Sequence, residues 1–302
     1  MFCGIAAFVV NLLASVHTAG MSDASEPTVS VDRAALRAFL IELLDQNSVF
    51  PNDAELIADV LLHAHAVGEP ASGLPLLPHW IRLIGEGQID PRGKPLPLAE
   101  APALLTLDGS SAPGPIGMKA AVDWAIATSR ETGAAVAIVK NGRDAGWPDY
   151  YITLISTAGL LGIVQSSGYR QWDDKSYCDR FAALPADGPC VAYCESFREP
   201  ASDPGGDPVF RQPLNVMATL LANGRTPMNR QSAPNPHQCE HFVIVVDPER
   251  GLGRDTVARC CAREYGADES GAVEPSDTIA VPVPLLDRLS ELAAAVDVAT
   301  PW

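Results

Sequence analysis

The first stretch whose residues could take part in catalysis or ligand binding is AHAVGEPASGLPLLPHWIRLI, residues 64–84. It follows an amphipathic segment and has the character of an active-site loop, yet its centre reads Ala-Ser-Gly around Ser72. A serine hydroxyl does not titrate near neutral pH, so Ser72 can hydrogen-bond a ligand but is a poor acid or base. His63 and His65 are two residues apart and point to different faces of a helix, so they form no paired metal site.

The seven cysteines give little evidence of a metal site. Their number is odd, and none has the paired spacing of a zinc site. Cys190 and Cys194, with Cys178 upstream, are a weak metal motif. We favour buried, reduced thiols, which suit a cytoplasmic protein, and we expect no metal.

Composition excludes one class of partner. The chain has 302 residues, 47% of them hydrophobic, which is enough for a substantial core in one large domain or two smaller ones. Lys and Arg number 21 against 37 Asp and Glu, a net charge of −16. Nucleic-acid binding needs a basic face, so we expect no such partner.

The first twenty residues, MFCGIAAFVVNLLASVHTAG, have an apolar run of signal-peptide length but no Lys or Arg before it. The run is too short for a convincing membrane span, and Met21 offers a second start. We therefore expect 1–28 to be an N-terminal extension that is disordered or comes from an over-extended start, with a secretion signal at 1–20 as the alternative. We expect a single domain over 29–302, in the cytoplasm.

Helical and strand patterns alternate along that domain. Helical spacing of apolar residues predicts helices over 31–45, 54–67, 77–89, 114–133, 149–159, 213–224, 253–266 and 282–297. Short apolar runs predict strands at 134–140, 160–167 and 241–248, and an extended segment over 91–109 that ends in a strand and a turn. The stretch 168–211 is irregular. This alternation favours a mixed α/β fold. No Rossmann glycine motif, nucleophile elbow, HExxH or Walker sequence is present.

Several framework segments together resemble the malate/L-lactate dehydrogenase family of the non-Rossmann type, from about residue 31 to residue 298. They include NDAELIADVLLHAHAVG, LLTLDGSSAPGPIGMKAAVDWAIATSRETGAAVAIVKN, GWPDYYITLISTAGLLGIVQSS and HFVIVVDPE. The resemblance implies a mixed sheet with flanking helices and a homodimer. The family includes ureidoglycolate, sulfolactate and Δ1-piperideine-2-carboxylate enzymes.

The residues that carry the family's chemistry differ here. Ser72 stands where the resemblance implies an acid/base histidine, and Leu76 where it implies a carboxylate-binding arginine. In the turn NGRDAGWPDYY, Asp144 replaces a second histidine, while Asn141 and Gly146 are kept. The cofactor segment near 168–211 is shortened and keeps only Ser196 of its polar positions. Phe210 or Arg211 occupies the position of a lysine near the substrate.

The resemblance therefore implies that the family's active-site cleft is retained but is lined by different residues. We take Asp144, Tyr150 and Ser72 as candidate catalytic residues, although Asp144 can equally be a turn-capping aspartate. Candidate substrate-binding residues are His65, Trp147, Tyr151, Tyr169 and Arg211; Asn141, Gly146 and Ser196 are the family-equivalent cofactor positions.

Three functions follow from this pattern. We expect first a cofactor-independent enzyme of the cyclase, lyase or isomerase type, acting on a small apolar metabolite in specialised biosynthesis. The alternative is an NADH- or NADPH-dependent oxidoreductase of 2-oxo acids, 2-hydroxy acids or cyclic imines, with Asp144 or a tyrosine delivering the proton. The third is a non-catalytic pseudoenzyme or partner subunit.

Overall fold

The computed structural model describes residues 27–170, 175–183, 193–198, 239–250, 253 and 276–302. Within them a seven-stranded mixed sheet has the order β2-β3-β4-β8-β5-β6-β7. Its strands are β2 (Leu96–Ala101), β3 (Leu104–Asp108), β4 (Ala134–Gly142), β5 (Leu161–Arg170), β6 (Lys175–Ala183), β7 (Tyr193–Arg198) and β8 (Cys239–Val246). Only β3 and β4 pair in parallel; the other neighbours are antiparallel.

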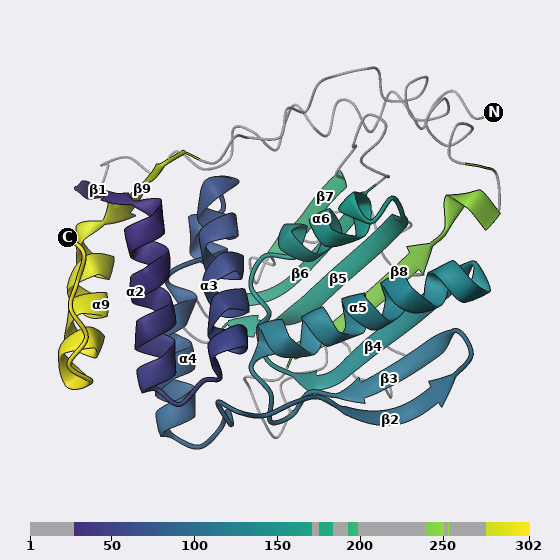
Figure 1. The fold of residues 1–302 in the computed structure, drawn as a ribbon, viewed down its shortest axis with the longest axis horizontal. Coiled ribbons are helices and arrows are strands. Elements are labelled where there is room, and N and C mark those ends of the chain that lie inside the picture. Colours follow the sequence, from purple (N-terminus) through teal and green to yellow (C-terminus); the bar gives the residue numbers. More distant parts are fainter. Residues whose placement is uncertain (1–26, 171–174, 184–192, 199–238, 251–252, 254–275) are drawn as a thin grey trace.

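Two helices cover one face of this sheet, α5 (Gly114–Thr132) and α6 (Asp149–Thr157) (Figure 1). Strand side chains alternate between faces, so Val139, Val164 and Val243 meet the helices, while Ile138 and Phe242 point the other way. Helix α5 ends at Gly133, whose φ of 89° is the left-handed conformation common at helix C-termini.

The remaining helices form a bundle beside the sheet (Figure 1). They are α2 (Arg33–Gln46), α3 (Pro51–Ala66), α4 (Leu76–Gly85) and α9 (Val283–Ala295). Their apolar stripes make a second core with a two-stranded sheet of β1 (Thr28–Asp32) and β9 (Thr278–Pro282). Helix α3 belongs to both cores: Ile57 and Leu61 lie in the bundle, Val60 and Ala64 against the sheet.

Most predicted elements of the described part are confirmed, and the α/β class is correct. The segment 168–211, which we expected to be irregular, contains β6 and β7. The segment 91–109 is a hairpin of β2 and β3 rather than one arm ending in a strand. The short strands β1 and β9 were not predicted. The helices expected at 213–224 and 253–266 lie outside the described residues.

Candidate active site

The candidate site comprises the end of β4 and the turn that follows it, residues 141–146. Asn141 starts it with a left-handed φ of 55°, and its amide donates to Asp108 Oδ1 at 3.2 Å. Asp144 is buried, and its Oδ1 accepts a 2.9 Å hydrogen bond from the Gly146 amide. The Tyr151 hydroxyl donates to the Ala145 carbonyl at 2.7 Å. The turn is thus a compact, buried platform around one carboxylate.

The loop that carries Ser72 lies against this turn. Ser72 ends a short 3-10 helix, Pro70–Ser72, and is fully buried. A Cβ added to Gly146, whose φ is 77°, would lie 2.6 Å from Val60 Cγ1 and 3.6 Å from the Ser72 carbonyl oxygen. The fold therefore brings together two of the segments that we singled out, although they are some seventy positions apart in the chain.

The aromatic candidates lie on or beside α6. Trp147 and Tyr151 are buried in the sheet-side core, and burial raises the pKa of Tyr151 well above its ordinary value. Tyr150 is half-buried between Tyr151 and His63, with ring centroids 5.4 and 5.6 Å away. Burial, and then the negative charges of nearby carboxylates, raises the pKa of Tyr150, so both phenols stay protonated at neutral pH.

His65 lies under the loop rather than beside Asp144. A Cβ on Gly73 would come within 3.1 Å of His65 Nδ1, and the ring hydrogen-bonds to the backbone of Ala280 in β9. Burial lowers the pKa of His65, and the Ala280 hydrogen bond opposes that effect only in part.

The three remaining candidates are Tyr169, Ser196 and Arg211. Tyr169 lies in β5 opposite Ser176, and Ser196 in β7 opposite Asp179, from backbone pairing. Arg211 lies outside the described residues.

Sequence reasoning missed Arg143, the residue before Asp144. Its side chain is buried, and its Nη2 donates to the Gln88 carbonyl at 2.8 Å. Its Nε has no hydrogen-bond partner, and no carboxylate in the described part of the chain pairs with it. Burial lowers its pKa, and the nearby Cys239 thiol acts in the opposite direction. A guanidinium remains charged in proteins, so this is a buried cation able to hold an anion.

Sequence reasoning also missed two histidine contacts. His241 Nδ1 lies 3.0 Å from Ser166 Oγ, and its Nε2 lies 2.9 Å from the Arg143 carbonyl oxygen. His63 Nε2 lies 2.7 Å from Asp149 Oδ2, which joins α3 to the first turn of α6. A sequence pattern cannot reveal either pair, because its members are 75 and 86 positions apart.

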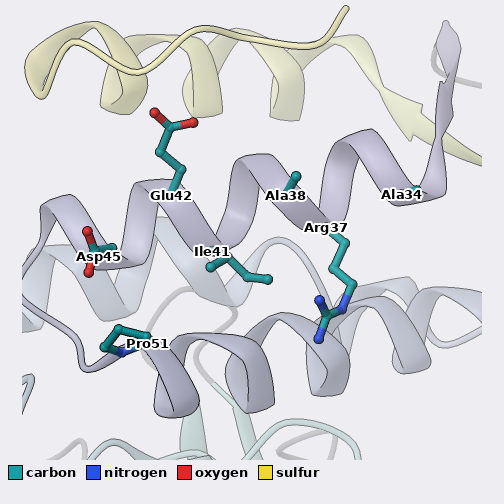
Figure 2. A pocket seen from close by; sticks show the side chains of 7 residues that line it. All are labelled: Ala34, Arg37, Ala38, Ile41, Glu42, Asp45 and Pro51. Atoms are coloured by element: carbon teal, nitrogen blue, oxygen red, sulfur yellow. The ribbon is translucent and has the colours of Figure 1, made fainter.

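One hollow in the described residues lies away from this turn. Figure 2 shows it along α2 and the start of α3, lined by Ala34, Arg37, Ala38, Ile41, Glu42, Asp45 and Pro51. Its guanidinium, on Arg37, is already engaged by Asp59, with Nε 2.6 Å from Oδ1. The groove is open, its arginine is already paired, and its two carboxylates, Glu42 and Asp45, lie along the exposed side of a helix, so we place the chemistry at the buried turn.

The described part of the chain holds neither a cluster of metal-binding side chains nor a helix that could span a membrane. There, no three or more His, Cys, Asp or Glu side chains are grouped to bind a metal ion. No helix in those residues combines the length and hydrophobicity needed to cross a membrane.

Residues 31–171 match the model of the family described as malate/L-lactate dehydrogenase. These residues, somewhat under half of the chain, are similar to the malate/L-lactate dehydrogenase family. The L-sulfolactate dehydrogenase of Methanocaldococcus jannaschii is 28% identical over 127 residues, which are 42% of this chain and 37% of that protein. The malate dehydrogenase of Pyrococcus horikoshii is 25% identical over 138 residues, 46% of this chain and 38% of the relative. These alignments thus span under two-fifths of the relatives' length.

Solved structures extend the similarity of fold to most of the chain. The sulfolactate dehydrogenase from M. jannaschii has a TM-score of 0.74 at 17% identity, over 90% of this chain and 98% of that one. The Δ1-piperideine-2-carboxylate reductase from Pseudomonas syringae has a TM-score of 0.67 at 15% identity, over 88% of this chain and all of that one. The family's fold therefore extends beyond residue 171, where the family model no longer matches.

The similarity to these enzymes corrects one expectation. We expected no cofactor, because the family's polar cofactor positions are replaced here. The matching relatives are named as dehydrogenases and a reductase, and such enzymes exchange hydride with a carrier, which points to a nicotinamide cofactor. The expectation was wrong because it judged a binding site only by the residues that had been lost.

A nicotinamide dinucleotide is an anion, and the described residues can be tested against it. Arg143 fits an anionic oxygen, because its guanidinium is buried and has an unused Nε–H donor. The segment 168–211, which the resemblance implies is the family's cofactor segment, is described in part, as the end of β5 and as β6 and β7. The expected homodimer stays a prediction.

Proposed function

We propose that this protein is a nicotinamide-dependent oxidoreductase that interconverts a 2-hydroxy acid and a 2-oxo acid, or reduces a cyclic imine bearing a carboxylate. The observation that carries the proposal is the buried turn in which the carboxylate of Asp144 directly follows Arg143, a buried cation that pairs with no carboxylate among the described residues. The relatives support the substrate class, because sulfolactate, malate, hydroxycarboxylate and Δ1-piperideine-2-carboxylate are all carboxylic acids.

In this proposal Asp144 moves the proton. When a 2-hydroxy acid is oxidised, its hydroxyl proton passes to the Asp144 carboxylate while the hydrogen on the same carbon leaves as hydride. The bound nicotinamide supplies or accepts that hydride. The Gly146 amide, which donates to Asp144 Oδ1, and the buried surroundings hold the carboxylate in one orientation.

Arg143 supplies the positive charge in this proposal. The resemblance implies an arginine at position 76, where this chain has leucine. A guanidinium at position 143 can pair with a carboxylate through charge-assisted hydrogen bonds, which are stronger than those between neutral groups. The buried cation therefore compensates for the missing arginine.

The first test is to titrate the purified protein with NADH and NADPH, following nicotinamide fluorescence and binding heat. We expect saturable binding of one of them, followed by turnover with a panel of 2-oxo acids and cyclic imine carboxylates. No binding at millimolar concentration and no turnover would overturn the proposal and favour the pseudoenzyme or partner-subunit role.

The second test is Asp144→Asn, which keeps the shape of the side chain but cannot accept the proton. We expect kcat to fall by about a hundredfold or more, the usual contribution of a general acid or base. The matched control is Asp123→Asn, an exposed aspartate of α5 that pairs with Lys119 and should retain the wild-type rate. Equal rates for both variants would exclude Asp144 as the proton carrier.

A further inference from the structure

The pair of Ser166 and His241 lies on the helix-covered face of the sheet, at the end nearest the turn. The two residues are direct neighbours across the β5–β8 ladder, and both side chains are buried. The alternation of β8 places His241 on the same face as Val243 and Val245, which contact the helices. A buried imidazole in this position needs hydrogen-bond partners, because an unsatisfied polar group is costly there.

The partners of His241 fix which ring nitrogen carries the proton. Its Nε2 lies 2.9 Å from the carbonyl oxygen of Arg143, which can only accept a hydrogen bond, so Nε2 is protonated and donates. Its Nδ1 is then the acceptor for the Ser166 hydroxyl, 3.0 Å away. The Arg143 carbonyl therefore selects the tautomer that directs an N–H at the backbone of the turn, and the Ser166 hydroxyl supports it by donating to Nδ1.

The backbone that receives this hydrogen bond is tightly confined. A Cβ on Gly142 would lie 3.1 Å from His241 Nε2, so the imidazole packs directly against the start of the turn. From the side of α5, a Cβ on Gly114 would come within 2.5 Å of the Arg143 carbonyl oxygen and within 1.9 Å of that of Asp144. The peptide between Arg143 and Asp144 is thus held between the imidazole and the first turn of α5.

We infer that His241 is a positioning residue, which, with Ser166, orients the peptide that carries Asp144. The inference rests on the proposed function, in which Asp144 moves a proton on the substrate. The hydrogen bond to the Arg143 carbonyl fixes one side of the turn, and Tyr151 fixes the other through the Ala145 carbonyl. A carboxylate displaced by about 1 Å from its reactive position loses on the order of a hundredfold in rate.

The test compares His241→Gln, which keeps an N–H donor, with His241→Ala, which has none. We expect His241→Ala to lower kcat by about ten- to a hundredfold with KM within about twofold, and His241→Gln to restore most of the loss. Ser166→Ala should give a smaller fall in kcat, and its matched control is Ser129→Ala. Ser129 is equally buried, but its hydroxyl donates to Ile126 within α5, so the control should keep the wild-type rate.

A second measurement does not depend on turnover. Amide hydrogen exchange of a peptide covering 141–146 should be faster in His241→Ala and Ser166→Ala than in the wild type, and close to wild type in His241→Gln. If the wild type neither binds a nicotinamide cofactor nor turns over, the proposed function fails, and exchange alone tests the positioning. Unchanged exchange in every variant, or equal losses of kcat in His241→Gln and His241→Ala, would overturn the inference. Should His241→Ala fail to fold, His241→Gln and Ser166→Ala still decide it.

Discussion

At the scale of single residues, the buried charge of Arg143 is the most informative feature of the site. Removing a charge from water costs several kcal/mol, and proteins normally offset that cost with an opposite charge. In the described part, Arg143 has one backbone carbonyl and no carboxylate, while Arg37 and Lys94 are both paired with aspartates. A ligand that brings an anionic oxygen to Arg143 would supply the missing partner.

This charge leads to a prediction about ligand-dependent stability. Oxalate, a small dicarboxylate, should raise the melting temperature of the wild type, because an anion that binds only the folded state stabilises it. At a hundred times its Kd we expect about 2.7 kcal/mol, which corresponds to a rise of several degrees. Arg143→Met should abolish the rise in a thermal-shift assay.

The matched control is Arg82→Met, which removes an exposed arginine that pairs with Glu86 on α4. It should keep the full oxalate response. An equal response in Arg143→Met and the wild type would show that oxalate binds elsewhere, and Arg143 would lose its assigned role.

Only part of the site could be predicted from the sequence. Asp144 was identified because it occupies a motif position in a recognisable turn. Arg143 precedes it in the same turn, but nothing in the sequence indicates that an arginine there is buried and lacks a carboxylate. His241 could be read only as the first residue of an apolar strand, because its pairing with Ser166 depends on the register of two strands far apart in the chain.

At the scale of elements, the predictable parts are those with a strong local pattern. Helix α3 and strand β8 follow from the spacing of their own apolar residues. The pairing of β1 with β9 joins residues about 250 positions apart, so no local pattern reveals it. Strands β6 and β7 lie among charged, proline and cysteine residues, where the alternation of a strand is obscured.

The contact between α3 and β9 should make stability depend on pH. Burial lowers the pKa of His65 below its ordinary 6.5. Between the lowered pKa of the folded protein and the ordinary pKa of the unfolded chain, the folded protein therefore binds fewer protons than the unfolded chain. The stabilising contribution is therefore complete above about pH 6.5 and is lost as the pH falls toward the folded-state value. The melting temperature should fall more between about pH 8 and about pH 5.5 in the wild type than in His65→Gln.

The comparison contains its own control. At about pH 8 the histidine is neutral in both states, so the difference between the two proteins there measures only packing and the Ala280 hydrogen bond. The additional difference at low pH isolates the titration of His65. Parallel melting curves across the whole range would rule out this residue as the source of acid sensitivity.

At the scale of the whole molecule, the two cores share one helix. Ile57 and Leu61 of α3 face the bundle, while Val60 and Ala64 face the sheet. A helix that is buried on both sides transmits the loss of one core to the other, so we expect the described part to unfold in one cooperative step.

Tryptophan fluorescence can test this cooperativity, because Trp80 lies in the bundle core and Trp147 in the sheet core. In two variants that each keep one of these tryptophans and replace the others with Phe, the denaturation midpoints should coincide. Leu61→Ala, which creates a cavity in the bundle, should cost about 2–5 kcal/mol and lower both midpoints together. A shift confined to the Trp80 signal would instead indicate two independently unfolding units.

The β1–β9 ladder also determines the order in which the protein can mature on the ribosome. Helices α2, α3 and α4 are synthesised first, but Val281, Leu286 and Leu289, which complete their core, follow the end of α4 by about 200 residues. Because domains fold as units during synthesis from the N-terminus, the nascent bundle carries an uncovered apolar surface until translation has passed β9 and α9. That interval is when the chain is most exposed to aggregation and most dependent on chaperones.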